Sequence, residues 1–168
     1  MTHTASLPTR VRGFYAAAGH RAAPLEAVTL LLLRLAAARV FWLSGLGKVE
    51  TFDLGPLRLP TPELQNSTKF LFRSEFFPDL PRAAAEGMAV LAAAGELILP
   101  VLLVLGLFAR IGALGLLIMT LVIQIFVFPG EWWSVHVWWA VILAHLAVRG
   151  PGVISLDRRF GLEKSSKS

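Results

Sequence analysis

The sequence predicts an all-α membrane protein, a bundle of four transmembrane helices with both termini in the cytoplasm. Of the 168 residues, 55% are hydrophobic and only 16% are charged, which is more apolar surface than one soluble domain of this size can bury. The apolar residues fall into four blocks, each close to the ~20 helical residues that cross a bilayer. Lysines and arginines gather near the two ends of the chain.

The four blocks are bounded by residues that interrupt helices. They cover residues 25–49, 83–107, 110–128 and 132–148 of a single membrane domain. Pro24 precedes the first block, Pro129 and Gly130 end the third, and the segment Gly-Pro-Gly at 150–152 ends the fourth. The fourth block is near the short limit for a span. Four tryptophans near its start resemble an interfacial aromatic belt.

The distribution of basic residues predicts the orientation. The tails at 1–24 and 149–168 carry an excess of arginine and lysine, whereas the long connection at 50–82 has a balance of acids and bases. The positive-inside rule therefore places both tails in the cytoplasm and residues 50–82 outside. The basic tails are expected to meet anionic lipid headgroups and not nucleic acid.

The outer loop at 50–82 has two parts. Residues 53–56 and 59–62 are rich in glycine and proline and indicate turns or extended chain. Residues 67–77 contain four phenylalanines and two basic residues, a composition typical of a helix that lies in the membrane interface. A plain loop that packs on the helix ends is the alternative.

Ionisable groups are costly inside a membrane span and call for a partner or a function. Six polar side chains fall inside the predicted helices: Arg34, Arg39, Glu96, Gln124, His136 and His145, the last of them near the inner interface. Counting ~1.5 Å per residue from the cytoplasmic ends places Arg39, Glu96, Gln124 and His136 at about 17–21 Å, with Arg34 about one turn lower. Glu96 is expected to pair with Arg34, with Arg39, or with both. The two arginines lie about 140° apart around their helix, so one of them is expected to meet headgroups or a partner protein instead.

The predicted second helix has two further features. Ala85, Ala89, Ala92 and Ala93 form a surface of small residues, which allows close approach of another helix. Pro100 lacks the N–H that would bond the carbonyl of Glu96. A buried acid beside a free carbonyl suggests a ligand or proton site, although ion pairs of this kind also serve only to tie helices together.

Several kinds of chemistry find no support in the sequence. There are no cysteines, which excludes disulfides and thiolate-ligated metals within this chain. His136 and His145 are nine residues apart and face opposite sides of a helix, so they cannot share a metal or haem. No catalytic residue and no metal ligand is assigned, and the chain is not expected to act as an enzyme on its own.

Five segments resemble the DoxX family. They are Arg34 followed by FWLSGLGK at 41–48, LFRSEFFP at 71–78, ELILP at 96–100, LGLFAR at 105–110, and GPGVISLD at 150–157. Together they cover roughly residues 30–157, and Arg39 is not part of the pattern. Gln124, Pro129, Trp133, His136 and Trp139 resemble members that accompany multinuclear iron oxidative enzymes, which modify peptides in clusters linked to copper handling.

The resemblance implies a multi-pass protein of the bacterial inner membrane, in a family whose name derives from a quinone-linked oxidoreductase context. The leading hypothesis is an accessory subunit of a quinone-linked redox system, with Glu96 relaying a proton under the influence of Arg34 or Arg39. Gln124 and His136 would bind a quinone oxygen, and Lys48, Phe76, Phe77, Trp133 and Trp139 would line the entrance. The alternative is a non-enzymatic scaffold or a permease-like factor for a small solute, in a peptide-modification or copper-handling pathway. A partner protein is expected under both hypotheses, and a homo-oligomer is possible.

Overall fold

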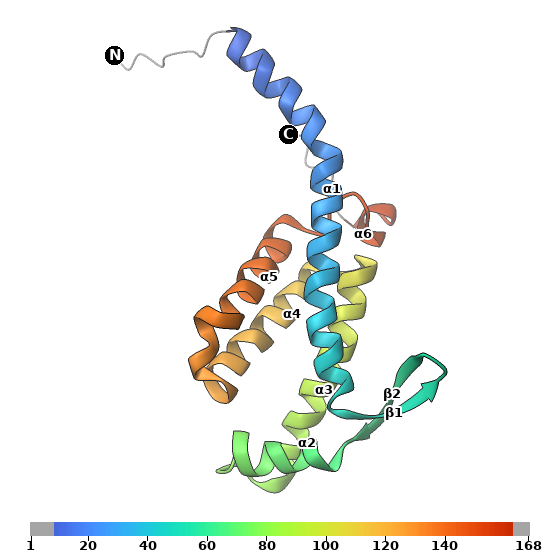
Figure 1. Ribbon diagram of the computed structural model, residues 1–168, viewed down its shortest axis with the longest axis vertical. Coiled ribbons are helices and arrows are strands. Elements are labelled where there is room, and N and C mark those ends of the chain that lie inside the picture. Colours follow the sequence, from blue (N-terminus) through green and yellow to red (C-terminus); the bar gives the residue numbers. More distant parts are fainter. Residues whose placement is uncertain (1–8, 163–168) are drawn as a thin grey trace.

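The computed structural model describes residues 9–162, and side chains from residue 24 onward. The outermost parts of the two predicted cytoplasmic tails, residues 1–8 and 163–168, therefore lie outside the described residues. The chain is mostly helical (Figure 1). Its elements are α1 (Thr9–Leu46), β1 (Val49–Leu54), β2 (Leu57–Leu64), α2 (Asn66–Leu71), η1 (Phe72–Phe76), α3 (Arg82–Leu105), α4 (Ala109–Val122), η2 (Ile123–Val127), η3 (Pro129–Glu131), η4 (Trp132–His136), α5 (Val137–Arg149) and α6 (Leu156–Arg159).

Three helical segments are long and apolar enough to cross a membrane. They are Pro24–Leu46, Arg82–Leu105 and Ala109–Val127, and their bounds lie within a few residues of the first three predicted blocks. The fourth block is helical from Trp132 to Arg149 across η4 and α5, but it is not among the three. Large apolar side chains cover the outside of these helices, including Leu91 and Ile111 with 70% and 64% of their surface exposed, as a lipid-facing surface requires.

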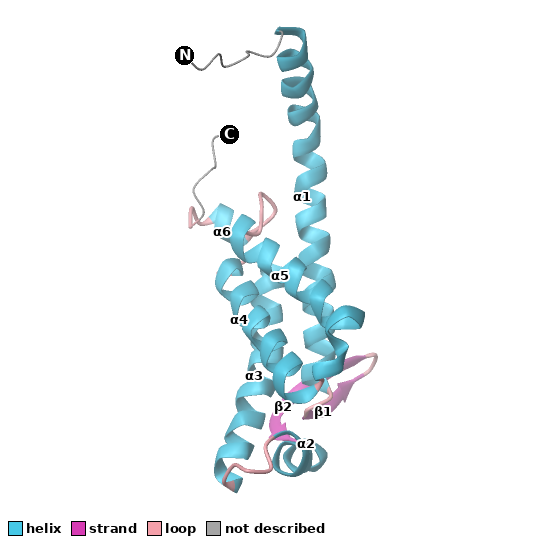
Figure 2. Ribbon diagram, turned by 90° about the vertical axis from the view of Figure 1, so that its left-hand side faces the viewer, coloured by secondary structure: helices cyan, strands magenta, loops and turns pink. Residues whose placement is uncertain are grey.

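Helices α1, α3, α4 and α5 pack side by side (Figures 1 and 2). Helix α1 contacts α3 and α5, while α4 contacts α3 and α5. Glycines allow the close approaches. A Cβ at Gly45 of α1 would lie 2.9 Å from Cδ2 of Leu97, and one at Gly115 of α4 would lie 2.8 Å from Cδ1 of Leu99. The predicted small-residue surface of α3 is confirmed at Ala85, Ala89 and Ala93, which are all buried.

The expectation of an all-α fold is wrong at the predicted outer loop. Strands β1 and β2 form an antiparallel hairpin in which Leu54 pairs with Leu57. Gly55, with φ of +62°, makes the tight turn between them, which confirms the turn predicted at 53–56. The segment predicted at 59–62 as turn or extended chain lies in β2. The short helices α2 and η1 occupy the positions of the helix predicted at 67–77.

Helix α1 also differs from its prediction at both ends. It begins at Thr9, within the predicted tail, because the alanine-rich segment before Pro24 favours helix strongly enough to continue through a proline. It ends at Leu46 and not at residue 49, where β1 has already begun. The hairpin and α2 lie toward one end of the packed helices, and α6 lies at their other end, beyond which the first part of α1 extends (Figure 2).

Candidate functional site

A cavity of about 560 Å³ lies among α1, α2–η1, α3, α4–η2, η4 and α5. Apolar side chains make most of its wall, among them Leu43, Met88, Ile118 and Val122. The polar groups concentrate at a few points, chiefly Lys48, Glu96 and His136. This volume and this pattern are those of a site for a small, largely apolar molecule that is oriented by a few polar contacts.

Glu96 and Lys48 form an ion pair in the wall of this cavity. The Nζ atom of Lys48 lies 2.6 Å from Oε2 of Glu96 and donates a second hydrogen bond to Oγ of Ser44, at 2.9 Å. The Glu96 side chain has only 2% of its surface exposed, whereas that of Lys48 has 20%. Charge neutralisation at this depth therefore comes from a lysine at the end of α1, one turn after Ser44.

The prediction that Glu96 pairs with an arginine is wrong. Arg34 is buried at the other end of the molecule, where it donates hydrogen bonds to the carbonyl oxygens of Val104, Pro151 and Ile154. Counting residues along a helix gives the depth of a polar side chain. Its ion-pair or hydrogen-bond partner also depends on helix rotation and on where the C-terminal segment folds. Residues 150–157 fold back against α1, and their carbonyl oxygens accept hydrogen bonds from the Arg34 guanidinium. No carboxylate lies at hydrogen-bond distance from it in the described part of the chain.

His136 and Gln124 are brought together as expected of the polar layer. Nδ1 of His136 and Oε1 of Gln124 are 2.6 Å apart, and Nε2 of Gln124 donates to the carbonyl oxygen of Pro129, also at 2.6 Å. His136 is buried and packs beside the indole of Trp139, with ring centroids 5.3 Å apart. Because the Gln124 amide nitrogen is used by Pro129, its oxygen faces His136 and accepts from Nδ1. The Nε2 atom of a neutral His136 is then an acceptor.

Three π-helical turns supply part of the cavity wall. Phe72 and Phe76 come from η1, Ile123 and Val127 from η2, and His136 from η4. A π-turn inserts an extra residue into a helix and redirects the side chains that follow, and such turns are common at functional sites.

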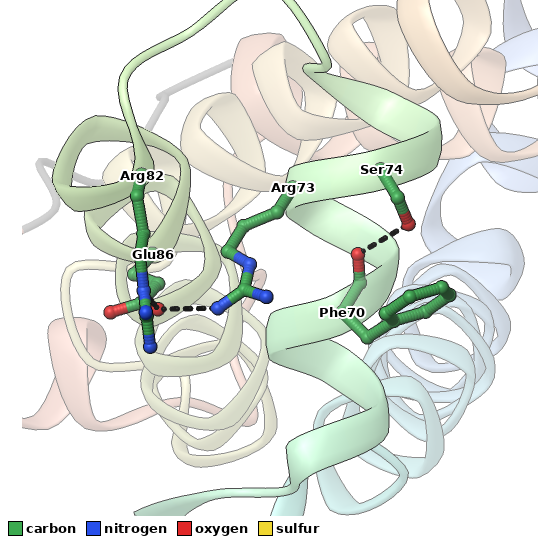
Figure 3. Close-up of polar contacts among 5 residues, drawn as sticks. All are labelled: Phe70, Arg73, Ser74, Arg82 and Glu86. Carbon is green, nitrogen blue, oxygen red and sulfur yellow. Dashed lines mark hydrogen bonds and ion pairs between the residues drawn. The ribbon is translucent and has the colours of Figure 1, made fainter.

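The segment α2–η1 covers one side of the cavity and is attached to α3. Arg73 of η1 lies 3.2 Å from Oε1 of Glu86, and the same oxygen accepts from Nε of Arg82 at 2.9 Å (Figure 3). Ser74 donates to the carbonyl oxygen of Phe70 within the segment. The Phe72 ring packs edge-on against Phe76 and at a tilt against Phe77, and Phe77 contacts Phe126 of η2.

The residues expected at the entrance divide into two groups. Lys48, Phe76, Phe77 and Trp139 line the cavity. Trp133 does not, because it faces outward with 79% of its surface exposed. Thus the aromatic wall comes largely from η1 and α5.

Arg39, which was expected in the buried layer, is exposed. It lies in a separate groove between α1 and α3, beside Leu35, Ala38, Trp42 and Val101. Among residues 24–162 it has no hydrogen-bond or ion-pair partner.

Sequence reasoning missed the structural junction at the α6 end of the molecule. Asp157 accepts from the backbone N–H groups of Phe108 and Ala109, at 2.7 and 2.9 Å, and so caps the start of α4. Gly106, with φ of +64°, ends α3, and a Cβ there would lie 2.5 Å from Cβ of Ser155. The segments LGLFAR and GPGVISLD therefore form one structural junction. In the sequence, only the family resemblance connects these two segments.

Comparisons with known proteins bear on the origin of this arrangement. No curated protein and no solved structure matches the chain. The family model DoxX matches residues 29–129, which include Arg34, Lys48, Glu96 and Gln124 and more than half of the chain. The chain belongs to the DoxX family.

Proposed function

We propose that this membrane protein is an accessory subunit of a quinone-linked redox system, and that the cavity holds the quinone ring. The observation that carries the proposal is a largely apolar cavity with a buried Lys48–Glu96 ion pair and His136 in its wall. A quinone has a flat apolar ring with two carbonyl oxygens on opposite edges, and therefore suits an apolar site with a few separate polar groups.

The polar residues have complementary roles in this proposal. Lys48 donates a hydrogen bond to a carbonyl oxygen of the quinone, and Nε2 of His136 accepts one from the hydroxyl of the quinol. Oxidation of a bound quinol by a partner oxidoreductase would release two electrons to that partner and two protons, which Glu96 and Nε2 of His136 would accept. Gln124 holds the His136 ring in the required tautomer. Trp139 and the phenylalanines of η1 enclose the ring.

The proposal includes a location and a topology. The run Trp132–Arg149 has 18 residues, about 27 Å of helix, which is close to the thickness of the bilayer core. We place it as a fourth crossing of the bacterial inner membrane. Both ends of the chain are then cytoplasmic, and the hairpin with α2 lies on the outer side, where the cavity opens toward lipid that carries quinone. The partner is an oxidoreductase or a peptide-modifying enzyme.

Quinone retention tests the proposal. The protein is purified in mild detergent, its small molecules are extracted, and quinone is quantified by mass spectrometry. We expect near-stoichiometric quinone in the unchanged chain and at least a fivefold loss in Glu96→Gln, because the substitution removes the charge that orients Lys48. Glu63→Gln, on β2 and away from the cavity, is the matched control and should retain quinone fully.

Folding is checked separately by size-exclusion profile and thermal unfolding. His136→Gln provides a second variant that leaves the ion pair intact, and it should also lower retention. Quinone no higher than in an unrelated helical membrane protein would contradict the proposal. Equal retention in all variants would also contradict it.

A further inference from the structure

The exposed residues in the cavity wall show where the cavity opens. In the described structure they fall mainly into two groups on different pairs of helices. The first group lies on α1 and α2 and comprises Leu43, Ser44, Gly47, Ser67 and Leu71. Two hydroxyl groups and the partly exposed Lys48 beside Ser44 make this mouth partly polar. It connects the Lys48–Glu96 ion pair to polar surroundings at the end of α1.

The second mouth lies between α3 and α4 and is apolar. Met88 and Leu91 of α3 and Ile118 of α4 line the cavity, and Leu91 and Ile118 keep 70% and 53% of their surface exposed. Each of these two residues is nine positions from the nearer end of its span, about 13 Å. This mouth therefore opens inside the hydrocarbon layer, where it meets lipid chains and not headgroups or water.

Packing on either side limits the extent of the apolar mouth. Toward the middle of the bundle, α3 and α4 are in close contact, since a Cβ at Gly95 would lie 2.9 Å from Sδ of Met119. Toward the start of α3, the ring of Phe77 contacts that of Phe126, with centroids 6.0 Å apart. The mouth is thus a lateral window between these two contacts.

The two mouths indicate the shape of the ligand. We infer that the cavity takes a quinone with a long apolar chain, which leaves the cavity between Leu91 and Ile118 and extends into the bilayer. The ring then lies beside Lys48, Glu96 and His136. This inference rests on the proposed function and adds to it the class of quinone and its route.

The chemistry of the two mouths supports this route. A quinone with a long chain is dissolved in the hydrocarbon layer, so a mouth within that layer admits it without passage through water. The walls at Leu91 and Ile118 offer the chain apolar contacts like those of lipid. The polar mouth on α1 and α2 is then left free for water to reach the ion pair.

Tryptophan substitutions at the apolar mouth test the inference. Leu91→Trp and Ile118→Trp, singly and together, narrow the mouth. Ile98→Trp and Ile111→Trp are the matched controls, each two helical turns from its counterpart and on the same face of its helix. Both control positions are exposed, but neither lines the cavity. The probes are decylubiquinone and the same ring without a chain, and their affinities for the full-length protein are measured by titration calorimetry in mild detergent, with protein-free micelles subtracted.

We expect a loss that depends on the chain of the probe. The paired substitutions at Leu91 and Ile118 should weaken the binding of decylubiquinone by about fivefold or more, because the indole rings occupy the path of the chain. The chainless ring should keep its affinity, because it does not occupy the mouth. The paired control substitutions should change neither affinity. A loss confined to the chain-bearing probe does not arise from misfolding, which would remove both.

Several results would overturn the inference and leave the proposed function standing. One is an unchanged affinity for decylubiquinone in every mouth variant. Another is an equal loss of both probes in variants that keep the thermal unfolding of the unchanged chain. A third is binding of only the chainless ring to the unchanged chain. If neither probe binds to the unchanged chain, the inference and the proposed function fail together.

Discussion

At the scale of single residues, the buried charges of this protein have two different roles. Glu96 and Lys48 neutralise each other in the wall of a cavity, whereas Arg34 donates hydrogen bonds to three backbone carbonyl oxygens. The first arrangement leaves groups that a ligand can reach. The buried Arg34 leaves no polar group within reach of a ligand. Its hydrogen bonds connect α1 to the end of α3 and to the C-terminal segment.

The Arg34 contacts predict a large and specific stability effect. Arg34→Lys keeps the charge but loses the planar fork that reaches Val104, Pro151 and Ile154 together. We expect the free energy of unfolding to fall by about 2–4 kcal/mol, since hydrogen bonds to a charged donor contribute more than neutral ones. Thermal unfolding in detergent measures the change.

The matched control for this substitution lies five residues further along α1. Arg39→Lys should change stability by less than about 0.5 kcal/mol, because Arg39 is exposed and has no partner among residues 24–162. Equal effects of the two substitutions would show that the carbonyl contacts are not what makes Arg34 important.

At the scale of elements, α2–η1 behaves as a cover held by side-chain ion pairs. Its phenylalanines line the cavity, while Arg73 reaches Glu86 on α3. The helix was predictable from its density of aromatic and basic residues. The hairpin before it was not, because β1 and β2 bury little surface and the pairing of Leu54 with Leu57 depends on the turn at Gly55.

Removal of the Glu86 charge should loosen this cover. Glu86→Gln eliminates the ion pairs with Arg73 and Arg82. Because the Glu86 side chain keeps 32% of its surface exposed to solvent, we expect a loss of stability below about 1 kcal/mol. The chain has no cysteines, so Ala92→Cys gives a single thiol in the cavity wall. Its maleimide labelling should become roughly two- to fivefold faster in the Glu86→Gln background, because an opening that costs less free energy is populated more often.

Two controls accompany the labelling experiment. Gly130→Cys, at a position with open space around it, should react at the same rate in both backgrounds. Glu63→Gln, a charge removal on β2, should leave the Ala92→Cys rate unchanged. An unaltered Ala92→Cys rate in Glu86→Gln would mean that the cover does not open at this ion pair.

At the scale of the whole molecule, the proposed fourth crossing determines which segments of the chain lie on the same side of the membrane. Gly55→Cys and Gly130→Cys should react with an impermeant maleimide from outside the cell. Gly161→Cys should react only after permeabilisation. The Cβ positions of all three glycines are free of neighbours within 4 Å, so the reagent can reach them.

The labelling pattern distinguishes four crossings from three. If η4 and α5 did not cross the membrane, the thiols at positions 130 and 161 would lie on the same side. Gly161→Cys would then react from outside together with Gly130→Cys, and the proposed topology would be wrong.

The sequence by itself determined the helices and most members of the candidate site. Apolar blocks of membrane-spanning length are a local property, so three spans could be placed within a few residues of their ends. Polar residues inside such blocks stand out for the same reason. Glu96, His136 and Gln124 were identified in this way, together with Lys48 and the phenylalanines of η1 from the family segments.

Only the tertiary structure decided which of these residues meet. Residue counts along a helix give depth, but partner choice depends on helix rotation and on contacts between segments far apart in the chain. Gly45 brings α1 close to α3, and Lys48, just beyond the end of α1, reaches Glu96. Residues 150–157 return to Arg34 across more than a hundred positions. Because those contacts are set by packing and not by local pattern, Arg34, one of the two arginines expected beside Glu96, instead contacts the C-terminal segment near α6.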